Sequence, residues 1–179
     1  MRTTEMPVSI TPALPSERLL ISGMAQFYIY DFSEMAPEAE DGFGISEAGQ
    51  FGDIPYFDDY WTEADRHVLL IRWQGEPAGF ALLNTHSHLG GVVEHNMGEF
   101  FVLRRYRRRG VARAAVAEVL RQFPGTWEVA VAHYNYGAMN FWPKAIAAAP
   151  NVSGLVRHQG DGTQWRGPVW RFVAAAPDL

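Results

Sequence analysis

Apolar and polar residues follow patterns that predict a β-rich chain with three helices. From Ser16 the apolar positions recur at helical spacing as far as Tyr30, and Ser16 is a plausible N-cap. Apolar runs bounded by turn residues predict strands, with a hairpin turn at Gln74-Gly75-Glu76. The expected strands are residues 5–11, 67–73, 77–85, 94–103, 127–132, 151–158 and 164–173, and two more helices follow Gly110 and span 138–148.

The order of these elements fits an α+β domain built around one central sheet. A chain of 179 residues has the usual length of one domain, so we expect a single domain over residues 1–179. Between the first helix and the first hairpin, glycines interrupt an acidic segment at Gly42, Gly44, Gly49 and Gly52. A long irregular loop of this kind is often functional, for example as a substrate lid.

The composition of the chain excludes cysteine chemistry and argues against a membrane protein. The chain has no cysteine, which excludes disulfides, thiolate metal sites and a cysteine acyl-enzyme. No apolar run reaches about 18 residues, so we expect no membrane partner. The first fifteen residues lack the pattern of a signal peptide, and we therefore expect a cytoplasmic protein.

The net charge of −5 conceals two oppositely charged segments. Residues 31–65 contain no Lys or Arg and eleven acids: Asp31, Glu34, Glu38, Glu40, Asp41, Glu47, Asp53, Asp58, Asp59, Glu63 and Asp65. Residues 104–113 contain six arginines: Arg104, Arg105, Arg107, Arg108, Arg109 and Arg113. Such an asymmetry suggests two different partners. The acidic segment is either a solvated face or a region that attracts a cationic amine.

The segment from Glu99 to Ala117 carries the clearest chemical signal. A buried strand ending in Phe-Phe-Val-Leu leads into a basic loop, which feeds directly into an apolar-faced helix. The first turn of a helix leaves backbone N–H groups unpaired and is electropositive. Gly110 and Ala112 are small enough to let a diphosphate approach that backbone. The segment therefore predicts an anion-binding cradle.

The spacing Arg107-x-x-Gly110-x-Ala112 resembles the (Gln/Arg)-x-x-Gly-x-(Gly/Ala) signature of the GNAT acetyltransferases, in a matching strand–loop–helix context. Further along, Asn135-x-x-Ala138-x-x-Phe141-Trp142 resembles a second segment of that family. The resemblance implies a GNAT fold: a mostly antiparallel, twisted sheet with helices on both faces. It also implies acetyl transfer from acetyl-CoA to a primary amine by direct attack, with no metal. Dimers are common in the family, so a homodimer is also expected.

The resemblance assigns residues to the cofactor. The backbone of Phe100, Phe101 and Val102 would pair with the pantetheine arm, and Val102 or its neighbour would offer an N–H to the thioester oxygen. The loop would wrap the pyrophosphate through Arg107, Arg108, Arg109, Gly110, Val111, Ala112 and Arg113. Asn135 would touch the pantetheine arm or anchor the helix after it.

An attacking amine must lose a proton, so a general base is expected. The Glu that serves in histone-type relatives aligns with Asn96, whereas many small-molecule relatives carry an acid at the position of Glu99. Glu99 is the candidate base or ammonium ligand; the alternative is a strand-edge carboxylate in a salt bridge. The family's usual acid, a tyrosine, aligns with Trp142, so Tyr134 and Tyr136 are the substitutes. Without an acid, the domain would bind acetyl-CoA as a sensor or partner module.

The remaining candidates concern the acceptor and rival partners. Tyr30, Asp31, Tyr60 and Trp61 are expected to contact a small-molecule or peptide amine. The arginine run could be a nucleic-acid patch, but the chain is net acidic and carries no RNA or DNA motif, so no nucleic acid is expected. His86, His88 and His95 lack a fourth ligand for zinc, so no metal site is expected. Any of the three could still line the substrate cleft.

Overall fold

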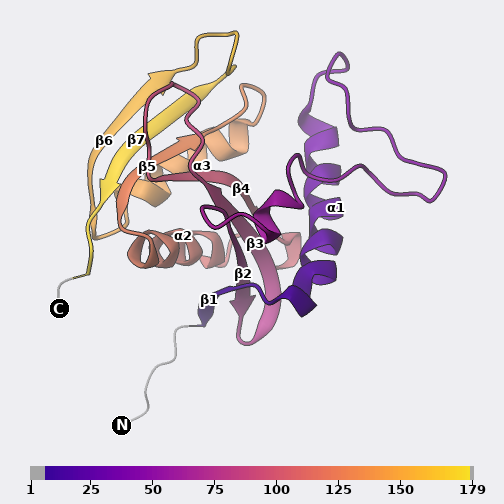
Figure 1. The fold of residues 1–179 in the computed structure, drawn as a ribbon, viewed down its shortest axis with the longest axis horizontal. Coiled ribbons are helices and arrows are strands. Elements are labelled where there is room, and N and C mark those ends of the chain that lie inside the picture. The colour runs from indigo at the N-terminus through magenta and orange to yellow at the C-terminus, as the bar shows by residue number, and fades with distance from the viewer. Residues whose placement is uncertain (1–6, 178–179) are drawn as a thin grey trace.

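The computed structural model describes residues 7–177, which form one seven-stranded sheet in the order β1-β2-β3-β4-β5-β7-β6 (Figure 1). The strands are β1 (Val8–Pro12), β2 (His67–Trp73), β3 (Glu76–Asn84), β4 (His95–Val102), β5 (Gly125–Ala130), β6 (Val152–Gln159) and β7 (Pro168–Ala174). The helices are α1 (Arg18–Met35), α2 (Val111–Gln122) and α3 (Tyr136–Ala147), with 3-10 turns η1 (Pro15–Glu17), η2 (Asp59–Trp61) and η3 (Arg104–Tyr106).

The predicted elements occur in the predicted order, with corrections at their ends. Ser16 is not the N-cap of α1, since it lies in η1 and Glu17 holds the cap position. Glu76 belongs to β3 rather than to the turn, because Gln74 and Gly75 alone reverse the chain, both at positive φ. Residues 5 and 6 of the first expected strand lie outside the described residues.

Two apolar cores cover the two faces of the sheet. On one face α1 contributes Ile21, Met24 and Ala25, which pack against β2, β3 and Phe101 of β4. On the other face α2 and α3 pack against β1, β2, β3, β5 and β7. Among the described strands, five of the six pairings are antiparallel. The α+β fold with a mostly antiparallel sheet and helices on both faces is confirmed.

The parallel pairing opens the centre of the sheet. β4 and β5 pair at only two positions, His95 with Trp127 and Asn96 with Glu128. Beyond Asn96 the described strands diverge, so the later part of β4 has β3 on one edge and no strand on the other. Buried backbone polar groups need partners. This edge is therefore where a bound molecule can complete the sheet.

A long segment from Ala36 to Asp58 contains no helix or strand and extends beyond α1 at the right of Figure 1. It returns to the body of the protein where Ile54 and Phe57 pack into the core beneath α1. Within residues 7–177, no helix has the length and apolar character needed to cross a membrane.

Candidate active site

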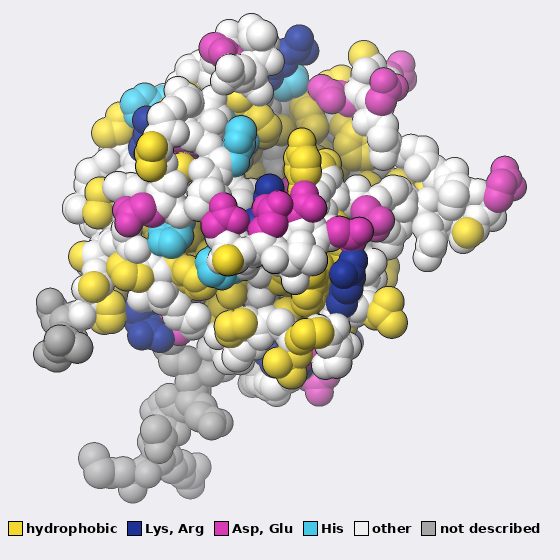
Figure 2. Space-filling model, viewed as in Figure 1, with side chains coloured by type: hydrophobic (Ala, Val, Ile, Leu, Met, Phe, Trp, Pro, Cys, Tyr) yellow, Lys and Arg dark blue, Asp and Glu magenta, His cyan; other side chains and the backbone are white. Residues whose placement is uncertain are grey.

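Two cavities meet at β4. The first, of about 470 Å³, is walled by α1, the loop 41–55, β4 and the segment after β5, and it contains Glu99. The second, of about 830 Å³, is walled by α1, the end of β4, the basic loop and α3. Both are lined by Tyr28, Phe32, Phe100, Asn135, Ala138 and Trp142. We call the first the acceptor cavity and the second the cofactor cavity. Figure 2 shows a hollow lined by apolar side chains above a row of acidic ones.

The basic loop has the local geometry of an anion cradle. Gly110 is the N-cap of α2 in the left-handed conformation (φ +79°), and no side chain caps the helix. The N–H groups of the first turn are therefore left for a ligand. A Cβ at Gly110 would meet no atom within 4 Å, so the space in front of this backbone is open. Gly110, Ala112 and Arg113 line the cofactor cavity.

The arginines of the loop divide into two groups. Arg107 donates through Nε to the Val102 carbonyl at 2.7 Å and pairs through Nη2 with Asp31. Arg104 also pairs with Asp31, at 2.7 Å. Within residues 7–177, Arg108, Arg109 and Arg113 form no ion pair, so their charge remains available. Arg108 and Arg113 line the cofactor cavity, whereas Arg109 is exposed outside it.

The predicted pantetheine strand has a free edge. Phe100, Phe101 and Val102 all line the cofactor cavity. The Leu103 N–H donates to Ala78 in β3 at 2.8 Å. Because successive N–H groups of a strand point to opposite edges, the Val102 N–H is directed to the edge without a partner strand. Val111, by contrast, is buried in the core under α2 and could contribute only its backbone.

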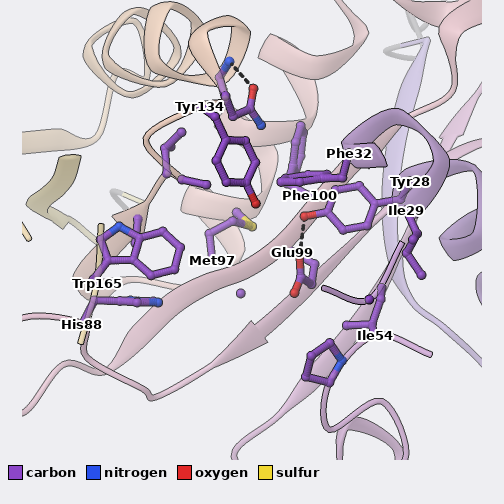
Figure 3. Close-up of a pocket in the computed structure, with 18 of the residues that line it drawn as sticks. Tyr28, Ile29, Phe32, Ile54, His88, Met97, Glu99, Phe100, Tyr134 and Trp165 are labelled. Atoms are coloured by element: carbon purple, nitrogen blue, oxygen red, sulfur yellow. Dashed lines mark hydrogen bonds between the residues drawn. The ribbon is translucent and has the colours of Figure 1, made fainter. Parts of the chain in front are cut away.

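Glu99 lines the acceptor cavity, next in the strand to Phe100, which lines both cavities. It lies on β4, half-buried, and accepts a hydrogen bond from the Tyr28 hydroxyl of α1 at 2.5 Å (Figure 3). Burial raises its pKa to about 7, although the hydrogen bond from Tyr28 opposes this. Among the described residues Glu99 has no cationic partner, and its hydrogen-bond partner is the Tyr28 hydroxyl.

The two candidate tyrosines occupy different places. Tyr134 lines the acceptor cavity, and burial together with the nearby Glu40 raises its pKa. Tyr136 is 72% exposed and lines neither cavity. Trp142 is buried and packs edge-on against Phe100, with ring centroids 5.2 Å apart, and both residues line the two cavities. Asn135 caps α3 by accepting the Ala138 N–H at 3.0 Å, and it also lines both cavities.

The predicted acceptor residues lie near the cavities but mostly do not line them. Asp31 faces the cofactor cavity, where it holds Arg104 and Arg107. Tyr30 is 60% exposed on the outside of α1. Tyr60 is buried behind Gly98 and accepts a hydrogen bond from Asn84 at 2.6 Å. Trp61 packs against Phe57 away from both cavities.

Some residues that line the cavities were not predicted as site residues from the sequence, whereas His88 was named as one that could line the cleft. Tyr28 reaches Glu99; it shares a helical face with Ile21, Met24 and Ala25, a signal that indicates a buried position but not its partner. The acceptor cavity also receives His88, Trp165, Asp41 and Asp53 from loops. His88 lies there, while His95 packs on Phe123 and Trp127. In the described part of the chain, no three metal-ligating side chains converge.

Comparison with known proteins agrees with this geometry. Residues 21–146 match the model of the acetyltransferase (GNAT) family, so the chain belongs to that family. None of the curated proteins compared matches it in sequence.

Similar folds occur among solved structures at low sequence identity. An acetyltransferase from Thermus thermophilus superposes with a TM-score of 0.64 at 13% identity, covering 94% of this chain and 97% of that one. The PaiA N-acetyltransferase of Thermoplasma acidophilum, solved in complex with coenzyme A, superposes with a TM-score of 0.58 at 10% sequence identity. The match covers 94% of this chain and 99% of that one. A chimera of the spermidine N-acetyltransferase SpeG from Vibrio cholerae superposes with a TM-score of 0.53 at 9% sequence identity. The match covers 95% of this chain and 96% of that one.

Proposed function

We propose that this protein transfers an acetyl group from acetyl-CoA to a primary amine by direct attack. The observation that carries the proposal is the meeting of two cavities at β4. One of them contains an uncapped helix N-terminus with unpaired arginines, and the other contains a carboxyl group whose pKa is about 7. The cofactor cavity suits a diphosphate, and the acceptor cavity suits an amine that must lose a proton.

The residues present fit coenzyme A. Gly110, Ala112 and Arg113 would hold the pyrophosphate, and Arg108, which lines the same cavity, would add positive charge. The unpaired edge of β4 from Met97 to Val102 offers N–H and C=O groups to the two amides of a pantetheine arm. Acetyl-CoA would supply the acetyl group as an activated thioester.

The chain's own groups then account for positioning and proton transfer. The ionised form of Glu99 would take the proton of the acceptor ammonium, and the Tyr28 hydroxyl would hold that carboxylate in place. The amine nitrogen would bond to the acetyl carbon, the carbon–sulfur bond would break, and the second proton lost by the nitrogen would balance the one gained by the sulfur. The Val102 N–H would stabilise charge on the carbonyl oxygen. Tyr134 would return a proton to the departing sulfur.

Trp142 favours one alternative, a GNAT domain that binds acetyl-CoA but turns it over slowly. An indole N–H does not protonate a thiolate, and Trp142 occupies the position where the family usually has a tyrosine. Under this alternative Tyr134 would only line the cavity, and the domain would act as a sensor or partner module.

Thermal unfolding with saturating acetyl-CoA tests the cofactor assignment, with ADP and free pantetheine as controls. A ligand at about 100 times its Kd adds about 2.7 kcal/mol of stability. For a domain of this size that corresponds to a rise in Tm of about 5–10 °C. A rise specific to CoA compounds supports the assignment, and no rise contradicts it.

Release of free CoA thiol in the presence of a panel of primary amines then separates the two functions. Turnover that depends on the amine supports acetyl transfer. Tight CoA binding without turnover of any amine supports the sensor alternative.

A further inference from the structure

His88 has a distinctive place in the acceptor cavity. It lies on the loop between β3 and β4 and lines the acceptor cavity but not the cofactor cavity. Its ring contacts Trp165, from the loop between β6 and β7, with centroids 4.5 Å apart and steeply inclined planes (Figure 3). Two loops that follow different strands thus form one wall, opposite the side at which Tyr28 of α1 meets Glu99.

A buried carboxylate fixes this histidine. Glu128 of β5 is fully buried and accepts the His88 backbone N–H at 2.6 Å, while His88 Nδ1 lies 3.2 Å from the same oxygen. The other oxygen of Glu128 accepts from Ser87 at 2.9 Å and from Arg171 Nε of β7 at 3.0 Å. Arg171 also donates to the Gly90 carbonyl at 2.8 Å, which holds the loop.

The same contacts determine which nitrogen carries the proton. Burial alone would raise the pKa of Glu128, but hydrogen bonds from His88, Ser87 and Arg171 lower it to about 2. An ionised carboxylate only accepts hydrogen bonds, so Nδ1 of His88 must donate. When the ring carries one proton, that proton is on Nδ1 and Nε2 is an acceptor, and Nε2 has no hydrogen-bond partner within residues 7–177. Besides Glu128, the titratable group that packs against the His88 ring is His86, with ring centroids 4.8 Å apart.

The charged side chains that line the acceptor cavity are all acidic. Asp41 and Asp53 come from the long loop and Glu99 from β4. No Lys or Arg is among the described lining residues. A carboxylate on the substrate amine would meet no Lys or Arg there, whereas a second ammonium would meet groups that accept hydrogen bonds.

Given the proposed transferase function, we propose that His88 Nε2 accepts a hydrogen bond from a second, cationic amino group of the acceptor. The substrate class is then a diamine or longer polyamine, in which one amino group reaches Glu99 and another is held between His88 and Trp165. Asp41 and Asp53 add attraction from the long loop without forming the specific contact.

Three amines of equal chain length test this: cadaverine, n-pentylamine and δ-aminovalerate, assayed by thiol release at saturating acetyl-CoA. The wild-type protein is expected to favour cadaverine in kcat/KM by about tenfold or more, the effect of one hydrogen bond to a charged group. His88→Ala is expected to raise KM for cadaverine by a similar factor and to change KM for n-pentylamine far less, because that amine has no second ammonium. His88→Gln, which keeps an acceptor atom, is expected to recover part of the preference.

Two controls separate recognition from folding. His158→Ala alters an exposed histidine of β6 and is expected to match the wild-type protein. The KM for acetyl-CoA and the Tm of His88→Ala are expected to stay near the wild-type values, since the backbone N–H still bonds to Glu128. A parallel titration of cadaverine into the protein saturated with CoA, by calorimetry, reports binding without turnover.

The outcomes distinguish the two proposals. Equal kcat/KM for cadaverine and n-pentylamine, a preference for δ-aminovalerate, or a cadaverine preference that survives His88→Ala would each overturn the role of His88 and leave acetyl transfer standing. Binding of cadaverine that requires His88, without acetylation of any amine, would support the diamine site and refute the transferase function.

Discussion

The Tyr28 hydroxyl donates a 2.5 Å hydrogen bond to the Glu99 carboxylate, joining α1 to β4 across 71 positions of the sequence. Burial raises the pKa of Tyr28 well above its usual range, and the adjacent carboxylate raises it further. The tyrosine therefore remains a donor while Glu99 titrates near neutral pH. This pair places a proton acceptor where the two cavities meet.

Glu99→Gln is expected to lower kcat at least about a hundredfold, the lower range for loss of a general base. The pKa of about 7 means that the base is active above neutral pH, so kcat/KM of the wild-type protein should rise as pH increases through 7. Assays across pH 6–9 with one amine would show whether this rise is absent from the variant. An unchanged kcat would show that Glu99 is not the base. The affinity for acetyl-CoA should change little.

Tyr28→Phe is expected to move the rising limb of that profile to higher pH. The hydroxyl lowers the pKa of Glu99 by donating to its charged form, so its removal lets burial act unopposed. The phenyl ring should preserve the packing on Phe32 and Phe101, with ring centroids 4.8 and 5.8 Å away. A profile identical to that of the wild-type protein would contradict the coupling of these two residues.

Arg113→Ala is expected to weaken CoA binding about tenfold, since hydrogen bonds to charged groups contribute roughly 1.5–3 kcal/mol. Arg109→Ala is the matched control, because Arg109 lies in the basic loop just before α2 but does not line the cofactor cavity. Calorimetric Kd values for CoA would compare them. Equal losses in the two variants would indicate a diffuse charge effect instead of a defined pyrophosphate site.

Tyr134→Phe is expected to lower kcat by about tenfold or more if its hydroxyl returns the proton to sulfur. Tyr136→Phe alters a tyrosine of the same segment that is exposed and outside both cavities, and should behave as the wild-type protein. A second variant, Trp142→Tyr, places a phenol at the family position and should restore part of the lost rate in the Tyr134→Phe background. Tyr134 is not the acid if its loss leaves kcat intact.

Glu128→Gln is expected to lower the free energy of unfolding by about 2–3 kcal/mol near pH 7, since it leaves Arg171 and His88 without a buried anion. The folded pKa of about 2 lies below the ordinary value of 4.5, so the carboxylate stabilises the fold above pH 4.5 and loses that effect as pH falls. Urea unfolding should show a difference that shrinks below pH 4.5. Glu63→Gln, an exposed ion-pair partner, should cost under about 0.5 kcal/mol.

The basic loop and the order of the helices and strands could be predicted from local sequence patterns. The loop from Arg107 to Ala112 is contiguous, and its strand–loop–helix setting follows from local periodicity and from one glycine at positive φ. For the same reason the hairpin at Gln74-Gly75 and the helix that follows Gly110 were predictable to within a few residues. Asn135 also acts locally, because it caps the helix that it precedes.

The contacts around the acceptor cavity depend on packing between distant parts of the chain and could not be predicted from local patterns. Tyr28 meets Glu99 across 71 positions, and Glu128 reaches His88 across 40 and Arg171 across 43. Periodicity shows that a side chain is buried, but packing of the helix on the sheet selects its neighbour. The predicted acceptor residues Tyr30, Tyr60 and Trp61 had the right chemistry but lie on faces that turn away from the cavity. The acceptor cavity is lined by residues from loops that follow different strands and helices, and these residues are brought together only when the sheet forms.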